Sequence, residues 1–306
     1  MMCNSRQQHR VHARRAVTVM ILAAALSMVF PSLLCAQQLK MPAIPTVLKE
    51  PRDRAAYLIE HYWDNMDFND SSLTKDMEFM ELSFVNFLSV FPIVDEPVLR
   101  NGVRTLLTKA STDESAYKVV AMLADKYLYD ANSPMLNEGY YALFLEHLLK
   151  SRIFDEGELS RLDFQYSVTQ KNMVGTVATD FGYVTREGKR NTLHGTEAEH
   201  MLLIFYDPEC GHCAEIMTML YSHTRLNQLI KEGKMNVLAV DAEEDRNEWK
   251  RHLPQMPEVW TVGFATSEIQ PRRLYYLRAM PTLFLLDKEK RVIVKDLRPE
   301  QLNEFL

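Results

Sequence analysis

The amino-acid sequence predicts an all-α region followed by a separate α/β domain that has a mixed central sheet flanked by helices. From about Pro51 to Met173, apolar residues recur every three or four positions, which is typical of helices that each bury one face. After Lys171 the pattern changes to short apolar runs, of the kind found in buried strands, alternating with helical stretches. The length of 306 residues also agrees with two domains.

The helical region is predicted from its apolar stripes and from a few capping signals. Ser111 and Glu114 fit a capping box at the start of one helix, and Asp155 with Glu158 opens another that runs to about Gln170. Residues 132–134, Asn-Ser-Pro, indicate a loop before a helix with proline in its first turn. The stripes are Ala55, Leu58, Ile59, Tyr62; Phe79, Leu82, Phe84, Phe87, Leu88; Val98, Val103, Leu106, Leu107; Tyr117, Val120, Leu123, Tyr127; and Tyr140, Leu143, Phe144, Leu148.

In the second region, apolar runs and turn signals predict strands that alternate with helices. A hairpin over about 181–193 comes first, and a buried strand is expected at 201–206 and another at 235–241. Between and after these strands we expect one helical stretch with a shared apolar face, a polar helix, a further helix and a closing hairpin. Their positions are Ile216 to Ile230, Glu243 to His252, Gln270 to Ala279, and 282–286 paired with 291–295.

Composition and charge exclude several classes of protein. Charged residues make up 25% of the chain and hydrophobic residues 47%, so wholesale disorder is excluded. No two of the 10 glycines lie closer than Gly182 and Gly188, so the glycine-rich phosphate-binding motifs are absent. The formal charge of −6 argues against a nucleic-acid-binding face, and we expect no nucleic-acid partner.

The first 36 residues have the layout of a secretory signal peptide. A basic segment with four arginines and no acid precedes the largely apolar run Ala16 to Phe30, and cleavage is expected after Ala36. The alternatives are a retained membrane anchor, for which the run is short, and lipidation of Cys35, which Leu33 and Leu34 do not favour. We therefore expect an exported protein, in a bacterial periplasm, whose remaining 270 residues carry a formal charge of −10.

Export leaves two cysteines, Cys210 and Cys213, in the sequence Cys-Gly-His-Cys. A buried strand ends just before this motif and a helix begins on it, so the first sulfur lies where a helix N-terminus favours thiolate. The alternatives for such a pair are a structural loop and half of a metal site, but no second cysteine pair or histidine cluster accompanies it. The spacing therefore favours redox chemistry, and we expect neither a metal site nor a cofactor.

The residues around the cysteines have two interpretations each. His212, with Gly211, tunes the stability of the thiolate, or it is an exposed polar residue of the first turn. Glu215 shuttles a proton to Cys213, or it is an exposed helix glutamate. Asp207 and Glu209 are interpreted as solvated turn residues whose charge opposes the effect of the helix end.

Several segments between about Gly175 and Leu306 together match one known family. These segments are Ala178-Thr179-Asp180-Phe181, Gly188, Leu193, Leu203-Ile204-Phe205-Tyr206, Cys210-Gly211-His212-Cys213 and Met280-Pro281-Thr282, which leads into Leu283-Phe284-Leu285-Leu286-Asp287. In them the sequence resembles the thioredoxin superfamily, in particular its TlpA/ResA-like branch of exported bacterial thiol–disulfide oxidoreductases. The resemblance implies a thioredoxin fold, and it implies that Met280-Pro281 is the cis-proline loop, whose backbone pairs with a bound substrate strand. A trans proline that opens a strand is the alternative.

The sequence departs from this family at several positions. Glu209 replaces the usual tryptophan, Thr179 replaces a proline, and Ile204 stands where thioredoxin has a buried acid. Because isoleucine cannot accept a proton, either Glu215 assists the thiols or turnover is slower. The final helix, Pro299 to Leu306, is also short for the fold.

The helical region resembles a domain of unknown function that precedes TlpA-like modules in bacterial envelope proteins. This resemblance implies no activity, and we interpret its tyrosines and tryptophan as core or domain-interface packing. We divide the chain into a signal peptide (1–36), a linker (37–50), the helical domain (51–173) and the thioredoxin-like domain (174–306). The segments that carry the resemblance are Tyr62-Trp63-Asp64-Asn65, Asp67-Phe68, Tyr127-Leu128-Tyr129-Asp130, Asn132-Ser133-Pro134 and Asn137-Glu138.

The function predicted from the sequence is an exported thiol–disulfide oxidoreductase. We favour a reductase of disulfide-bearing proteins or thiols that is supplied by a membrane or periplasmic electron donor, although the Gly-His dipeptide favours a more oxidising pair. One alternative is a scaffold whose helical domain binds an envelope partner and whose thioredoxin module is a docking surface. Another is metal handling by both thiolates and His212. The peroxiredoxin arrangement PxxxTxxC is absent around Cys210.

Overall fold

The computed structural model describes residues 38–243, 245–266, 269–270 and 272–306. The predicted signal peptide, residues 1–36, therefore lies outside the described residues. Lys40 to Leu306 form one compact unit. Within the described ranges, no helix is both long enough and apolar enough to cross a membrane.

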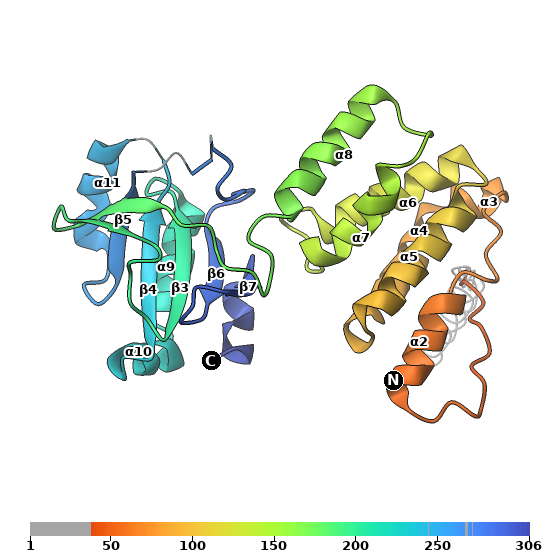
Figure 1. The fold of residues 1–306 in the computed structure, drawn as a ribbon, viewed down its shortest axis with the longest axis horizontal. Coiled ribbons are helices and arrows are strands. Elements are labelled where there is room, and N and C mark those ends of the chain that lie inside the picture. Colours follow the sequence, from red (N-terminus) through yellow and green to blue (C-terminus); the bar gives the residue numbers. More distant parts are fainter. Residues whose placement is uncertain (1–37, 244, 267–268, 271) are drawn as a thin grey trace, which may run out of the picture. The chain divides into compact units, whose positions relative to one another are not determined.

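The first part of this unit, the helical region, consists of helices and connecting turns (Figure 1), which confirms the predicted all-α region. Its core is built from large aromatic side chains; Tyr62 and Trp63, for example, are both buried and contact the ring of Phe87. Burial of each such side chain contributes about 1.5–3 kcal/mol. The helices are α2 (Pro51–His61), α3 (Ser71–Thr74), α4 (Met77–Leu88), η1 (Phe91–Ile93), α5 (Glu96–Ala110), α6 (Glu114–Leu128), α7 (Glu138–Leu148) and α8 (Glu156–Thr169).

The helix starts differ from the sequence prediction at two places. α6 is capped by the side chain of Asp113, which accepts from Ala116 N–H at 2.8 Å, so the predicted capping box at Ser111 is wrong. α7 begins after Asn137, whose side chain accepts from Tyr140 N–H, and Pro134 lies in the preceding loop rather than in the first helical turn. In both cases a residue nearer the helix supplies the capping oxygen. The capping box of Asp155 with Glu158 is confirmed.

The second part of the unit, the sheet domain, has a 7-stranded mixed sheet in the order β2-β1-β5-β4-β3-β6-β7. β3 pairs in parallel with β4, and β4 pairs in parallel with β5, whereas the other pairs are antiparallel. The predicted mixed sheet flanked by helices is thus confirmed. The elements are β1 (Gly182–Thr185), β2 (Arg190–Thr192), β3 (His200–Tyr206), α9 (Gly211–Tyr221), α10 (Thr224–Lys231), β4 (Met235–Asp241), α11 (Arg246–His252), η2 (Leu253–Gln255), β5 (Thr261–Ala265), β6 (Thr282–Leu286), β7 (Val292–Lys295) and η3 (Pro299–Glu304).

The two faces of β3 belong to two different cores, because its side chains alternate. On one face Leu202, Ile204 and Tyr206 pack with α9, α10 and Trp249. On the other face the core includes Tyr275 from the segment that precedes β6. The strand is buried on both sides, which explains its continuous apolar sequence.

Three details of the sheet domain differ from the prediction. β5 was not predicted from the sequence. The predicted single helix after the cysteines is interrupted at Ser222, and His223 caps a new helix, α10. The predicted helix from Gln270 is absent among its described residues: Tyr275 and Leu277 are both buried, a spacing of two that fits an extended chain, and Arg273 has φ +51°.

Candidate active site

Cys210 lies at the point where the buried strand β3 has ended and helix α9 begins. Its own backbone N–H donates to Asp207 O at 3.2 Å, which closes the turn between strand and helix. As the N-cap residue of α9, Cys210 has a sulfur that accepts from Cys213 N–H at 3.3 Å. The free N–H groups of a helix start favour negative charge on such a sulfur. The first predicted site residue is therefore the N-cap of α9.

The two sulfurs of the motif differ in exposure. Cys210 is half-buried, whereas Cys213 is only 1% exposed and packs in the core beneath α9; both are free thiols. Burial raises the pKa of Cys213 to about 12. Of the two sulfurs, that of Cys210 is therefore the one that a molecule in solution can reach.

The three residues predicted to tune the pair lie on the exposed side of α9. His212 Nδ1 is 3.7 Å from Glu215 Oε2, and the Glu215 side chain is 81% exposed. Among the described residues, no contact joins Glu215 to the buried Cys213. Gly211 is also exposed, and a Cβ there would meet nothing within 4 Å. The tuning roles of these three residues stay predictions.

The Met280-Pro281 loop lies beside Cys210, as the family resemblance implied. The peptide bond between these residues is cis, and the Met280 carbonyl oxygen is 4.0 Å from Cys210 Sγ. Within the part of the chain that the structure describes, Met280 N–H donates no hydrogen bond. The loop thus presents a backbone donor next to the accessible sulfur, which is what an extended substrate segment would need.

A buried carboxyl group that the sequence reasoning missed lies in the same domain. Asp241 ends β4, where it is the register partner of Tyr206 on β3, and Tyr206 shares its core with Cys213. Asp241 Oδ1 accepts from Glu243 N–H at 2.8 Å, while Oδ2 is buried without a partner among the described residues. Burial, together with the neighbouring acids Glu243, Asp207 and Asp245, raises the pKa of Asp241 to about 6. In the sequence, this buried carboxyl group could have been found from the aspartate that ends a predicted buried strand.

Replacing Asp241 with asparagine is expected to stabilise the protein at pH 8 but not at pH 4. Because the folded-state pKa of about 6 lies above the ordinary value of 3.8, ionisation opposes folding as pH rises through this window. The cost of ionisation at pH 8 is about 3 kcal/mol, and Asp241→Asn removes it while keeping an oxygen for Glu243 N–H. Urea unfolding of both proteins at the two pH values measures the difference.

The matched control is Glu209→Gln, which changes an exposed carboxyl in the loop before the cysteines. We expect it to change the free energy of unfolding by less than about 0.5 kcal/mol at either pH. A gain for Asp241→Asn that is equal at pH 4 and pH 8 would contradict the argument.

The donor groups for a metal centre are not gathered at this site. Across the described residues, no group of three or more histidine, cysteine, aspartate and glutamate side chains is arranged to hold a metal ion. The two thiols and the nearby cis-proline loop remain as the chemically distinctive features of the site.

Two family models match the chain in the places where the structure has its two regions. Residues 3–172, more than half of the chain, match a domain of unknown function (DUF5106), and residues 199–292 match a model described as thioredoxin-like. The chain belongs to the DUF5106 family and carries a thioredoxin-like domain. Together with the fold and the comparisons below, these matches confirm the predicted TlpA/ResA-like thioredoxin fold.

Known relatives agree with this assignment. A thioredoxin-like protein from Bacteroides caccae is 34% identical and superimposes with a TM-score of 0.81 over 87% of this chain and 96% of that one, so the comparison includes both regions. The thiol–disulfide oxidoreductase ResA of Bacillus cereus is 26% identical over 144 residues, 46% of this chain and 81% of ResA. Nucleoredoxin of Bos taurus is 29% identical over 113 residues, 35% of this chain but only 25% of nucleoredoxin. This DUF5106 protein is thus a thiol–disulfide oxidoreductase by family.

Proposed function

We propose that this DUF5106 protein is an exported thiol–disulfide oxidoreductase that reduces disulfides in protein substrates through Cys210 and Cys213. The observation that carries the proposal is the position of Cys210: it caps α9, accepts from Cys213 N–H and lies 4.0 Å from the carbonyl oxygen of the cis-proline loop residue Met280. The relation to ResA supports the same chemistry. Export, to a periplasm, rests on the signal-like sequence of residues 1–36.

The reaction consists of two thiol–disulfide exchanges. The Cys210 thiolate attacks one sulfur of the substrate disulfide; that bond breaks, a mixed disulfide forms, and the released substrate sulfur takes up a proton. Cys213 then loses its proton and attacks Cys210 Sγ, which breaks the mixed disulfide and releases the second substrate thiol. Two electrons and two protons have passed to the substrate, and the protein holds a Cys210–Cys213 disulfide. A membrane or periplasmic dithiol donor then reduces it.

The core around Cys213 explains why the second exchange waits for the first. Because burial raises the pKa of Cys213 to about 12, this thiol stays protonated in the resting protein. In the mixed disulfide, the reactive sulfur of Cys210 lies one helical turn from Cys213. Cys213 therefore acts as an intramolecular nucleophile, and its high effective concentration offsets its low acidity. Glu215 and His212 lie on the exposed side of α9, away from the buried Cys213.

Reduction of insulin by the full chain tests the activity. With dithiothreitol as electron source, the wild-type protein is expected to precipitate insulin B chain at least about tenfold faster than dithiothreitol alone. The double variant Cys210→Ser, Cys213→Ser should return the rate to that of dithiothreitol. Equal rates for the wild-type and double-variant proteins would refute the proposed activity.

The direction of electron flow is tested by the reduction potential of the pair against glutathione. A reductase requires a value near that of thioredoxin, about −270 mV, rather than the value of about −120 mV that is typical of an oxidant. The buried Cys213 favours the lower value, because a thiol that burial keeps protonated gains no free energy from ionisation when the disulfide is reduced. A measured potential above about −150 mV would assign the opposite direction.

A further inference from the structure

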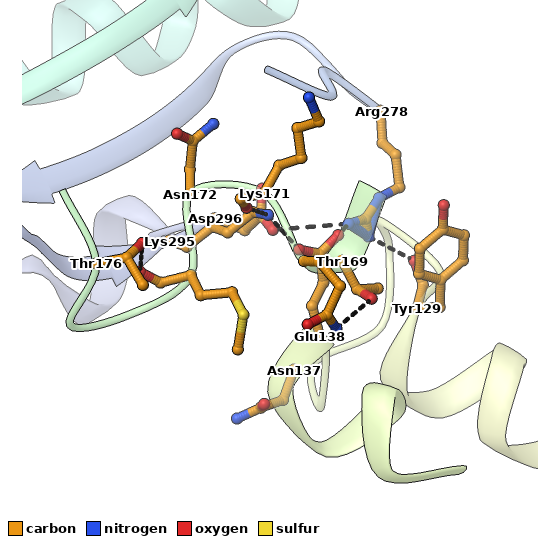
Figure 2. Close-up of polar contacts among 12 residues, drawn as sticks. Tyr129, Asn137, Glu138, Thr169, Lys171, Asn172, Thr176, Arg278, Lys295 and Asp296 are labelled. Atoms are coloured by element: carbon orange, nitrogen blue, oxygen red, sulfur yellow. Dashed lines mark hydrogen bonds and ion pairs between the residues drawn. The ribbon is translucent and has the colours of Figure 1, made fainter. Parts of the chain in front are cut away.

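A buried cluster of charged side chains connects the helical region to the cis-proline loop. Glu138, the first residue of α7, is paired with Arg278 and with Lys295 (Figure 2), and its side chain is only 5% exposed. Arg278 lies two residues before Met280, and Lys295 is the last residue of β7. Asp296 lies 3.9 Å from Arg278 and completes the cluster, which we call the interface network. The helical region is thus attached close to the predicted substrate-binding loop.

Further contacts join the helical region to the residues before the cis-proline loop and to the start of η3. The guanidinium of Arg278 lies over the ring of Tyr129, 4.2 Å from its centroid, and donates to Tyr129 O at 2.9 Å. The ring of Tyr129 also stacks with Tyr276. Arg298 donates to Pro134 O at 3.1 Å, which holds the loop of residues 131–136 against the start of η3. Cation–π contacts and charge-assisted hydrogen bonds of this kind are stronger when they are withdrawn from water.

Between these segments lies a cavity of about 370 Å³ next to the cysteine motif. Its walls come from three places: loop 131–136 of the helical region, His212 on α9 with the cis-proline loop, and residues 296–301 of the sheet domain. Met280 lines the cavity and its carbonyl oxygen lies 4.0 Å from Cys210 Sγ, so one wall of the cavity adjoins the accessible sulfur. This volume is within the usual range of ligand pockets, roughly 300–1,000 Å³.

We infer that loop 131–136 forms one wall of the substrate site, and that the occupant of the cavity is an extended polypeptide segment next to the substrate's disulfide. The inference rests on the proposed function and goes beyond it, because it gives the helical region a part in substrate recognition. A low-molecular-weight disulfide would contact Cys210 and Met280 without entering the cavity.

Two observations favour a polypeptide occupant. The N–H of Met280 makes no hydrogen bond within the described ranges, so it can pair with the backbone of an extended chain, and main-chain pairing is the usual way in which such segments bind. Met280 and loop 131–136 line the same cavity, so a chain paired at Met280 and bonded through its cysteine to Cys210 would pass the loop with the side chains that flank that cysteine. Specificity would then arise from a fixed wall, because the interface network holds the loop in place.

The test fills the cavity from the helical side and compares two disulfides. In the full chain, Asn132→Trp enlarges an exposed side chain of the loop, while the Asn132 N–H that donates to Asp130 is kept. With reduced protein in stopped flow, we expect the rate with insulin to fall about tenfold and the rate with 5,5′-dithiobis(2-nitrobenzoate) to stay within about twofold of wild type. Ala131→Trp, at the neighbouring exposed position, should act in the same way.

The matched control is Met122→Trp, a similar enlargement at a position on α6 that is 46% exposed, and it should leave both rates unchanged. Equal losses with both disulfides, or an unchanged insulin rate in both loop variants, would overturn the inference while leaving the proposed function intact. A wild-type protein that reacts with neither disulfide would refute the proposed function instead.

Discussion

The Cys213→Ser variant of the full chain is expected to accumulate a mixed disulfide between Cys210 and a substrate cysteine, whereas Cys210→Ser is expected to form none. The reason is the difference in exposure: Cys210 is half-buried at the start of α9, and Cys213 is enclosed in the core. Without Cys213 the first exchange still occurs, but the second has no nucleophile. Without Cys210, the remaining thiol is both inaccessible and protonated, because burial raises its pKa to about 12.

The measurement is non-reducing electrophoresis after mixing each reduced variant with insulin, followed by mass spectrometry of the adduct. We expect Cys213→Ser to be trapped in an insulin adduct with a yield at least about a hundred times that of Cys210→Ser, because removal of a nucleophile typically costs several orders of magnitude in rate. Turnover should be lost in both variants. A prominent adduct in Cys210→Ser would reverse the assignment of the attacking sulfur.

The local structure around the two cysteines was predicted correctly, because residues that are close in the chain determine it. Two cysteines after a continuous apolar run predict a sulfur at a helix N-terminus, and Cys210 is indeed the N-cap of α9. The strands His200–Tyr206 and Met235–Asp241 are buried on both faces, and their continuous apolar sequences therefore predict them. These features depend on residues that are close together in the chain, so they can be predicted from a single sequence.

Features that depend on distant partners were not predicted. Asp241 and Tyr206 become neighbours only because β3 and β4 pair in register. Glu138 appeared in the sequence only as part of a family-like segment, and its partners Arg278 and Lys295 lie more than a hundred residues further along the chain. The segment before Met280 contains residues compatible with a helix, yet its described residues form turns and bends, with Tyr275 and Leu277 buried in the core. Tertiary packing decided each of these cases.

Glu138→Gln is expected to lower the free energy of unfolding by about 3–5 kcal/mol, because it removes one charge from a buried set of ion pairs. The change keeps the size of the side chain, but it leaves Arg278 and Lys295 with Asp296 as their remaining acidic partner in the interface network. Little water reaches this cluster, because the side chains of Glu138, Lys295 and Arg278 are only 5%, 9% and 11% exposed, and this burial lowers the pKa of Lys295 to about 8. The lost charge therefore cannot be replaced by solvent.

Urea unfolding with two probes separates the expected effects. Trp63 reports on the helical region, and Trp249 and Trp260 report on the sheet domain. Replacing Trp63 by phenylalanine in one background, and the other two tryptophans in a second, gives separate fluorescence signals for the two regions. In the parent chain we expect coincident transitions, since the interface network couples the regions; with Glu138→Gln the transitions should separate.

The control is Glu96→Gln, which removes a carboxylate from an ion pair with Arg100 on the exposed surface of α5. Surface pairs of this kind contribute roughly 0–1 kcal/mol, so its unfolding should resemble that of the parent protein. A quadruple change, Glu138→Leu with Arg278→Met, Lys295→Met and Asp296→Asn, removes every charge of the interface network and should recover most of the lost stability, since apolar side chains of similar volume can replace a buried ion cluster. If Glu138→Gln costs no more than Glu96→Gln, the network does not hold the two regions together, and the fixed wall beside Cys210 loses its physical basis.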